Sequence, residues 1–257
     1  NEKAEVKKYE ITRGVIKSDR RFSYEEAQEI IEKGEGEYSE EIKTLNMLAQ
    51  KMRAKRFQSG AIDFQQAQVH FRLDEKGKPL SVYFSESNES HQLIEEFMLL
   101  ANRTVAERIG RKTPGNTPKT FVYRIHDQPN PEKLSMLSKF VSKLGYKMKS
   151  ASGRTTSASA LNSLLKDVHG SKEQNVIEQI SLRTMQKARY STENIGHYGL
   201  AFRYYTHFTS PIRRYPDLLV HRLLHRYLTL EARTVSKPKY EDLCEHCSAQ
   251  EQVAANA

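Results

Sequence analysis

The stretch His197–Leu224, HYGLAFRYYTHFTSPIRRYPDLLVHRLL, decides how we interpret the rest of the chain. At its centre, Ser210 and Pro211 are followed by two adjacent arginines, Arg213 and Arg214. An apolar run at helical spacing comes next, with Leu218, Leu219, Val220, Leu223 and Leu224. Serine is a preferred N-cap, and proline is tolerated in the first turn of a helix. The pattern therefore predicts a buried helix that begins at Pro211, with Ser210 as its cap.

The predicted helix start is suited to binding phosphate. Free backbone N–H groups and the positive pole of the helix dipole lie at such an end. The guanidinium forks of Arg213 and Arg214 match phosphate oxygens in geometry and charge. The same stretch is rich in aromatic rings, namely Tyr198, Phe202, Tyr204, Tyr205, Phe208 and Tyr215. Rings among cations are typical of proteins that bind single strands by base stacking. A capped surface helix with solvated arginines is the alternative interpretation.

The composition of the chain favours a polyanionic partner. The 257 residues include 41 Lys and Arg against 32 Asp and Glu, which gives a net charge of +9 at pH 7. This excess favours nucleic acid or another polyanion without distinguishing between them. Because no apolar run approaches the length of a membrane span, we expect no membrane partner and no signal peptide. Two cysteines argue against a disulfide framework and fit a reducing cytoplasm.

Hydrophobic periodicity predicts one α+β unit in which helices dominate. Ser23 and Glu26 form a capping box that starts one helix. Further helices are expected over Ser39–Phe57, Ser90–Ile109, Glu132–Leu144, Glu173–Arg189 and Pro211–Leu230, and from Tyr240 onward. A few strands are expected over Val6–Asp19, Thr120–Ile125 and the hairpin Gly60–Asp74 with Leu80–Ser85.

Two of these helices also have predicted inward faces. The first inward face consists of Ile42, Leu45, Leu48, Ala49 and Met52, and the second of Ile94, Phe97, Met98, Ala101 and Val105. The helix over Ser39–Phe57 ends in the basic run Lys51–Arg56. These cations either complement the C-terminal end of the helix dipole or form a strip beside an RNA channel.

The motifs together resemble those of a known family. H-Y-G-L-A with F-T-S-P-I-R-R-Y-P-D-L-L-V-H-R-L is similar to the signature of the ribonuclease II/ribonuclease R family. The segments R-G-V-I-K-S-D-R-R-F-S-Y, L-I-E-E-F-M-L-L-A-N and Y-R-I-H-D-Q-P-N-P-E-K-L are similar to the family's nuclease domain, in the same order. The resemblance implies a helix-dominated part of a ribonuclease II-type catalytic domain. It also implies a processive, magnesium-dependent 3′→5′ exoribonuclease that hydrolyses single-stranded RNA to nucleoside 5′-monophosphates.

The resemblance assigns roles to individual residues. Arg213 matches the family's catalytic arginine, which contacts the scissile phosphate and stabilises its transition-state charge. Glu96, or its neighbour Glu95, matches a glutamate that contacts sugar hydroxyls, and the 2′-OH distinguishes RNA from DNA. Tyr24 matches a tyrosine that cooperates in that contact, and Phe64 matches a ring that stacks on a terminal base. Without the resemblance, the glutamates are solvated charges, Tyr24 is a half-buried helix residue, and Phe64 is a core strand residue.

Two further residues beside Arg213 are expected to bind RNA. Arg214 is the second candidate for the phosphate, and Tyr215 supplies an aromatic ring next to the arginines. A salt bridge between Arg214 and Asp217, one turn later, is the structural alternative for that arginine.

The aspartate-rich motif of the family has no match in this sequence. Its clustered carboxylates would hold the metal ions, whereas the aspartates here are isolated, at Asp19, Asp63, Asp74, Asp127, Asp167, Asp217 and Asp242. The resemblance places the motif upstream of Asn1. We therefore expect residues 1–257 to be a single partial RNB-type domain, truncated at both ends and without flanking OB-fold domains. Magnesium is expected in the intact parent and not in this chain, which alone should be inactive. A non-catalytic RNA-binding module is the alternative.

Three other patterns have simple structural alternatives. Cys244–Cys247 has C-x-x-C spacing, and His221 with His225 is at i, i+4, so together they could supply zinc ligands. However, both pairs lie within ordinary amphipathic helical patterns, and no second C-x-x-C is present. The cysteines also lack the βαβ context of a redox motif. His126-Asp127 resembles an acid/base pair, but in a loop before a proline it more simply shapes a turn.

Overall fold

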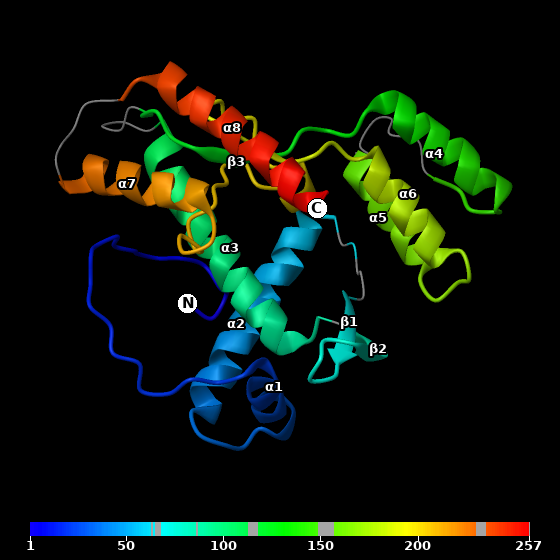
Figure 1. The fold of residues 1–257 in the computed structure, drawn as a ribbon, viewed down its shortest axis with the longest axis horizontal. Helices are drawn as coiled ribbons and strands as arrows, with labels where there is room; N and C mark the ends of the chain where they lie inside the picture. The colour runs from blue at the N-terminus through cyan, green and yellow to red at the C-terminus, as the bar shows by residue number, and fades with distance from the viewer. Residues whose placement is uncertain are drawn as a thin grey trace. The chain divides into compact units, whose positions relative to one another are not determined.

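Helices dominate the part of the chain that the structure describes, as the sequence predicts (Figure 1). The computed structural model describes residues 1–62, 64, 68–85, 87–112, 118–148, 157–229 and 235–256. The chain divides into two units, the first made of Asn1–Lys55 with Gln65–Phe97 and the second of Arg56–Phe64 with Met98–Ala257. Each unit is described by itself below.

The first unit is built from helices and one β-hairpin. Its elements are α1 (Tyr24–Lys33), most of α2 (Ser39–Gln58), β1 (Gln68–Leu73), β2 (Pro79–Ser85) and the start of α3 (Glu89–Gly110). The predicted capping box starts α1, because Ser23 Oγ accepts from Glu26 N–H at 3.2 Å and the Glu26 carboxylate accepts from Ser23 N–H at 2.7 Å. Gly34 ends this helix with φ of 73°, a conformation that glycine adopts without strain. The hairpin strands pair antiparallel, with Phe71 opposite Val82.

The expected strand over Val6–Asp19 is wrong. None of these residues has strand conformation, and both Val15 and Ile16 are almost fully exposed, at 102% and 94%. A strand needs a hydrogen-bonded neighbour and an apolar face to bury, and the charged residues in this weakly alternating segment provide no such face. The expected hairpin is confirmed, although residues 63 and 65–67 of its first arm lie outside the described residues.

The predicted inward faces of α2 and α3 are only partly correct. Leu45, Ile94 and Met98 are exposed, at 41%, 42% and 37%, whereas the polar Asn46 is buried at 9%. Asn46 is buried because its amide donates to a Glu89 carboxylate oxygen at 2.6 Å, which periodicity cannot reveal. The basic end of α2 has a further role in this unit, since Lys51 Nζ donates to the backbone oxygen of residue 2 at 2.7 Å.

The second unit combines a small sheet with several helices. It contains the rest of α3, then β3 (Tyr123–Ile125), α4 (Pro131–Lys143), α5 (Ser157–Val168), α6 (Gln174–Thr184), β4 (Arg189–Ser191), the 3-10 helix η1 (Tyr198–Leu200), α7 (Tyr215–Thr229) and α8 (Lys237–Ala255). Strands β3 and β4 pair antiparallel with Arg124 opposite Tyr190. Arg124 extends over the Tyr190 ring at 4.6 Å and forms two hydrogen bonds with Glu251 of α8. These contacts fix α8 against the small sheet.

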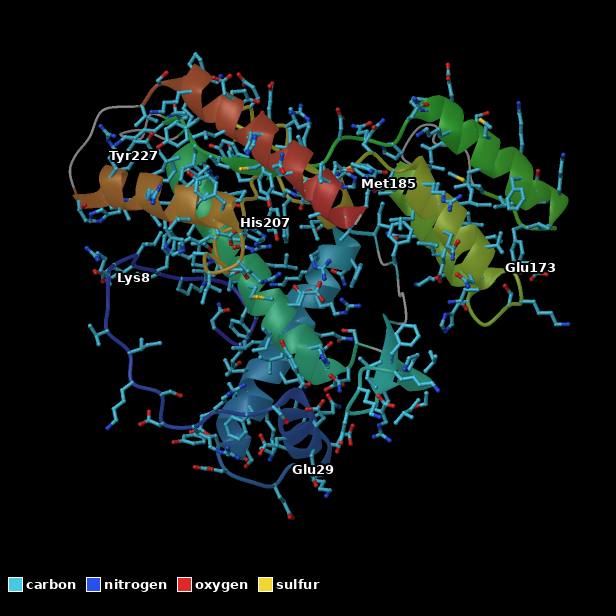
Figure 2. All side chains as sticks on the ribbon, in the orientation of Figure 1. Lys8, Glu29, Glu173, Met185, His207 and Tyr227 are labelled. Carbon is cyan, nitrogen blue, oxygen red and sulfur yellow. The ribbon has the colours of Figure 1, made fainter. Side chains whose placement is uncertain are left out.

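Helices α4, α5 and α6 pack around one apolar core (Figure 1). Its most deeply buried members are Leu137, Val141, Leu161, Leu164, Val168 and Ile177. Figure 2 labels Glu173, which precedes the first residue of α6, and Met185, which follows its last residue and joins this core. The cluster is therefore held together by side chains from three helices.

In this unit, one helix was not predicted, and the boundaries of three others differ from the expectations by several residues. Helix α5 has no counterpart among the predicted helices. Helix α6 ends at Thr184 because Arg189–Ser191 pairs with β3 as a strand instead of continuing the helix. Helix α8 begins earlier than Tyr240, with Pro238 in its first turn, where proline is tolerated. Helix α7 begins at Tyr215, and its expected last residue, 230, lies outside the described residues.

We expect Leu161→Ala to destabilise the chain much more than Leu182→Ala. Leu161 is fully buried at 0% exposure in the α4–α6 core, whereas Leu182 on α6 is 44% exposed. Truncating a buried leucine usually costs about 2–5 kcal/mol, and a surface change less than about 0.5 kcal/mol. The free energies of unfolding of both variants can be measured by urea denaturation. Equal losses for the two variants would contradict the assigned core.

Candidate nucleic-acid interface

The segment that leads to the two arginines is fixed by Asn102, a buried residue of α3. Asn102 is 3% exposed. Its Oδ1 accepts from Phe208 N–H at 2.9 Å and from Thr209 N–H at 3.2 Å, while its Nδ2 donates to the Tyr205 hydroxyl at 3.3 Å. The fully buried Thr206 also donates a hydrogen bond from Oγ1 to the backbone oxygen of Val122, the residue before β3, at 2.7 Å. The backbone before the arginines is therefore held in one register.

The arginines lie in a turn that precedes α7, and not in the first turn of that helix. The backbone N–H groups of Arg213 and Arg214 donate to Ser210 O at 3.3 and 3.1 Å, and α7 begins at Tyr215. The predicted helix start at Pro211 with a Ser210 cap is therefore wrong. Instead, the Ser210 N–H donates to Asp217 Oδ1 at 2.8 Å, so the side chain of Asp217 reaches back from α7 to hold the turn.

The two adjacent arginines have different surroundings. Arg214 Nη2 donates to Asp217 Oδ1 at 2.8 Å, and this carboxylate is completely buried at 0% exposure. The salt bridge that the sequence allowed as the alternative for Arg214 is therefore present. Arg213 is exposed, and its guanidinium makes only a long hydrogen bond, 3.5 Å, to Ser210 Oγ in the described part of the chain. Tyr215, next in sequence, is 49% exposed. The side chains of Arg213 and Tyr215 are thus exposed to solvent, whereas that of Arg214 is bound to Asp217.

Several rings of the aromatic segment pack inside the protein. Tyr205 is 6% exposed, and the Phe208 ring stacks on His221 of α7 with 4.2 Å between centroids. His221 Nε2–H donates to Phe208 O at 2.9 Å, which fixes this stack. Tyr198 packs against the α4–α6 core. Tyr205 is therefore buried among protein groups, and the Phe208 ring already stacks on a protein ring.

A group of half-buried histidines lies beside the same segment. The pKa of His207 is lowered to about 2, mainly by burial and to a smaller extent by the positive charges of Arg214 and Arg124. Burial likewise raises the pKa of Tyr190 to about 12, and its protonated hydroxyl is hydrogen-bonded to Nδ1 of the neutral His207 at 2.9 Å. Figure 2 labels His207, which precedes the arginine turn in the chain. The group is a hydrogen-bonded part of the interior in which the imidazole stays neutral.

His126 is held by the backbone on both sides of its ring. Its Nε2–H donates to Gln186 O at 2.8 Å, and its Nδ1 accepts from Gly199 N–H at 3.1 Å. Burial lowers the pKa of His126, which keeps the imidazole neutral. The ring of His126 therefore links its segment to the backbone of residues 186 and 199.

In the first unit, Tyr24 lies against the start of α3. Its ring stacks on His91 with 4.0 Å between centroids, and Ser90 Oγ donates to Tyr24 O at 2.9 Å. Glu95 lies one helical turn after His91 and so shares its face of the helix. Glu96 is 3% exposed, whereas Tyr24 is 43% exposed. Tyr24 is therefore beside the helix face that includes Glu95, and Glu96 is the more buried of the two glutamates.

Phe64 is half-buried and packs against the α4–α6 core. The residue is not in a strand, so the core-strand interpretation is correct for packing and wrong for conformation. The preceding Asp63 lies outside the described residues.

The cysteine and histidine pairs do not converge. Among the described residues, no group of three or more His, Cys, Asp or Glu side chains is placed to hold a metal ion. Cys244 is fully buried, and burial raises the pKa of its thiol to about 12, which opposes the thiolate that zinc requires. His221 already donates a hydrogen bond from Nε2 to Phe208 O.

None of the described helices has the length and apolar character that crossing a membrane requires.

Comparison with known proteins identifies the family. The family model described as the RNB domain matches residues 1–230. The chain belongs to the RNB domain family. It is 36% identical to ribonuclease R of Aquifex aeolicus and 36% identical to ribonuclease R of Thermotoga maritima, with alignments that cover 100% and 98% of this chain. The chain spans only 37% and 36% of the lengths of these two relatives.

The fold is also similar to that of a solved RNase R structure. Mycoplasma genitalium RNase R in complex with ribose-methylated single-stranded RNA has a TM-score of 0.81 and 27% identity. The match covers 92% of this chain and 38% of that chain. This similarity confirms the helix-dominated α+β class that the sequence predicts for the RNB domain.

Sequence reasoning missed the residues that hold the arginine turn. Asn102 was not singled out in the sequence, and Asp217 was considered as an isolated aspartate and as a partner for Arg214. Their burial is the decisive property, at 3% and 0% exposure. A polar residue at a helical position that should be apolar is the signal that could have found Asn102.

We expect the stability of the chain to fall as the pH drops from 7 to 5, and His207→Gln to reduce this fall. The folded state protonates His207 only near pH 2, whereas an unfolded histidine takes up its proton near about 6.5. Below about pH 6.5 the unfolded state therefore binds more protons than the folded state. The contribution of neutral His207 to the free energy of unfolding is complete above that pH, and below it decreases by up to about 1.4 kcal/mol per pH unit. Urea unfolding at both pH values measures the difference.

His169→Gln is the matched control, because His169 is exposed and replacing it should leave the pH dependence unchanged. The same slope in wild type and His207→Gln would show that His207 is not buried as a neutral imidazole.

Proposed function

We propose that this chain is the phosphate-contacting and RNA-binding part of a 3′→5′ exoribonuclease that hydrolyses single-stranded RNA to nucleoside 5′-monophosphates. The observation that supports this most directly is the exposed guanidinium of Arg213 on a turn whose backbone is fixed by buried residues. The names of the Aquifex and Thermotoga relatives, both ribonuclease R, support the same activity. We also propose that the parent protein acts in the cytoplasm.

Arg213 would act on the phosphate of the bond that is cleaved. A guanidinium offers two parallel N–H donors, which match two phosphate oxygens of a single group. Negative charge builds up on these oxygens as the bond breaks, so a fixed donor pair stabilises the transition state more than the ground state. A fixed turn matters here because a preorganised donor needs no reorganisation during the reaction. Arg214, already paired with the buried carboxylate of Asp217, would offer no fork of its own to the phosphate.

The remaining candidates would bind the rest of the RNA. Tyr24 and Glu95 or Glu96 would contact sugar hydroxyls, and a carboxylate that accepts from the 2′-OH would select RNA over DNA. Phe64 and Tyr215 would offer ring faces to bases. Phe64 has one side against the α4–α6 core, and Tyr215 is the more exposed ring.

The described residues do not fit a magnesium site. Carboxylate and other oxygen ligands are what magnesium prefers, and no group of three or more His, Cys, Asp or Glu among the described residues is placed to hold a metal ion. We propose that the carboxylates for magnesium belong to a part of the parent protein outside this chain. Bound there, the metal would activate water and neutralise phosphate charge. A non-catalytic RNA-binding module remains the second candidate, because the described residues supply binding groups without such carboxylates.

The isolated chain should bind single-stranded RNA without degrading it. Its charge of +9 favours binding, and log K should fall by about 0.7 per neutralised phosphate for each log unit of salt. Without clustered carboxylates, it should release no nucleotides from 3′-labelled RNA with magnesium present. Release of mononucleotides from the 3′ end that is lost in an Arg213→Ala variant would overturn the proposed division of the site.

In the intact parent protein, Arg213→Lys should damage turnover far more than RNA affinity. Lysine keeps the charge but presents a single flexible donor in place of the fork, and losing one preorganised donor typically costs about 10²–10³ in rate. RNA binding is spread over many bases and phosphates, so affinity should hardly change. Single-turnover rates and equilibrium binding measure the two effects.

Arg222→Lys is the matched control, because Arg222 is an exposed arginine on α7, after the turn. Small and equal losses of rate and affinity in Arg213→Lys would make Arg213 a residue that only positions the RNA.

A further inference from the structure

We infer that Asp217 and Arg214 form a positioning pair that fixes the direction of Arg213, with Asn102 as a second clamp on the same segment. This inference rests on the proposed function, because it gives Arg213 its role at the phosphate. It differs from a second phosphate contact by Arg214, which would require that arginine to leave Asp217. Neither Asp217 nor Asn102 needs to touch RNA in this account.

One carboxylate oxygen connects the two ends of the arginine turn. Asp217 Oδ1 accepts from the Ser210 backbone N–H at 2.8 Å and from Arg214 Nη2 at 2.8 Å. Ser210 is the residue whose carbonyl accepts the N–H groups of Arg213 and Arg214. Ser210 is therefore held at both of its backbone polar groups. Its N–H is bound by the Asp217 carboxylate, and its carbonyl accepts the N–H groups of the turn. Arg213 lies between the two residues that Asp217 binds, and its side chain is left facing solvent.

Asn102 holds the residues directly before Ser210. Its Oδ1 accepts from the consecutive N–H groups of Phe208 and Thr209, and its burial at 3% exposure leaves little room for another arrangement. Three consecutive backbone N–H groups, at residues 208, 209 and 210, are thus bound by two buried side chains. Such a row fixes the backbone up to the turn without using strand pairing.

The incomplete hydrogen bonding of the ion pair argues for positioning over stability. Asp217 Oδ2 and Arg214 Nε are both buried and have no hydrogen-bond partner among the described residues. A buried ion pair stabilises a fold well only when its remaining polar atoms are satisfied, and apolar replacements are often as stable. This pair is therefore poorly suited to stabilising the fold. What it does supply is a fixed geometry for the turn and a neutralised Arg214.

The test is a double-mutant cycle in the full-length parent protein, with Asp217→Asn, Arg213→Lys and the combined variant. Asparagine keeps an oxygen for the Ser210 N–H but removes the charge that retains Arg214. Because misplacing a reacting group by about 1 Å can cost 10²-fold, we expect Asp217→Asn to slow single-turnover cleavage by about 10- to 100-fold with unchanged RNA affinity. In the Arg213→Lys background, the same change should alter the rate by no more than about twofold.

Glu241→Gln is the matched control for a merely structural effect. Glu241 of α8 also accepts from a backbone N–H, that of Thr192 at 2.6 Å, and from the Ser191 hydroxyl at 2.7 Å. Its loss should lower the melting temperature while its effect on rate, if any, is the same in both backgrounds. Arg214→Lys provides a second variant in case Asp217→Asn does not fold. It keeps the charge beside Asp217, and should restore part of the rate relative to Arg214→Ala.

The outcomes are separable. An inactive wild-type parent protein would overturn the proposed function itself, and full activity in Arg213→Lys would overturn the role of Arg213 on which the positioning pair rests. If Arg213→Lys slows cleavage and Asp217→Asn slows it by the same factor in both backgrounds, the two effects are independent. That result would leave the proposed function in place and overturn the positioning pair. Loss of RNA affinity equal to the loss of rate in Asp217→Asn would also overturn it, because Asp217 would then support binding in general.

Discussion

The carboxylate of Asp217 is the contact on which the geometry of the candidate site depends. It is fully buried, it binds the backbone of Ser210, and it retains Arg214. A buried carboxylate is costly unless a positive charge and hydrogen bonds compensate for it. The turn compensates one oxygen of this carboxylate, through the Ser210 N–H and Arg214, so the site and the core of the second unit cannot be arranged independently. Helix α7 supports Asp217 rigidly, because its residues Leu219, Val220 and Leu223, which follow Asp217, are buried.

This arrangement explains how two neighbouring arginines can have different tasks. Identical side chains at consecutive positions have similar intrinsic properties, so only their surroundings can separate them. Asp217 neutralises Arg214, and the turn leaves Arg213 exposed. The neutral histidines nearby fit the same logic. His207 lies where the charges of Arg214 and Arg124 disfavour another cation, and its hydrogen bond with Tyr190 suits the uncharged ring.

Much of the helical framework could be predicted from the sequence because local signals specify it. The capping box at Ser23 and the apolar spacing after Tyr215 are contained in short windows. The strand at Arg189–Ser191 could not be predicted, because its conformation depends on pairing with β3 far away in the chain. The same holds for the start of α7. Ser210 and Pro211 have the local character of a helix start, but α7 begins only at Tyr215, and Ser210 is held instead through its N–H by the side chain of Asp217, seven residues later. Asn102 was missed for the related reason that its partners are about a hundred residues away in sequence.

The most direct test of this account is a crystal structure of the intact parent protein with an uncleavable single-stranded RNA. The account predicts that the Arg213 guanidinium lies within hydrogen-bond distance of the scissile phosphate, while Arg214 stays on Asp217 and the N–H groups of residues 208–210 keep their partners. A structure in which Arg214 leaves Asp217 and its fork binds that phosphate, with Arg213 in solvent, would contradict the central claim.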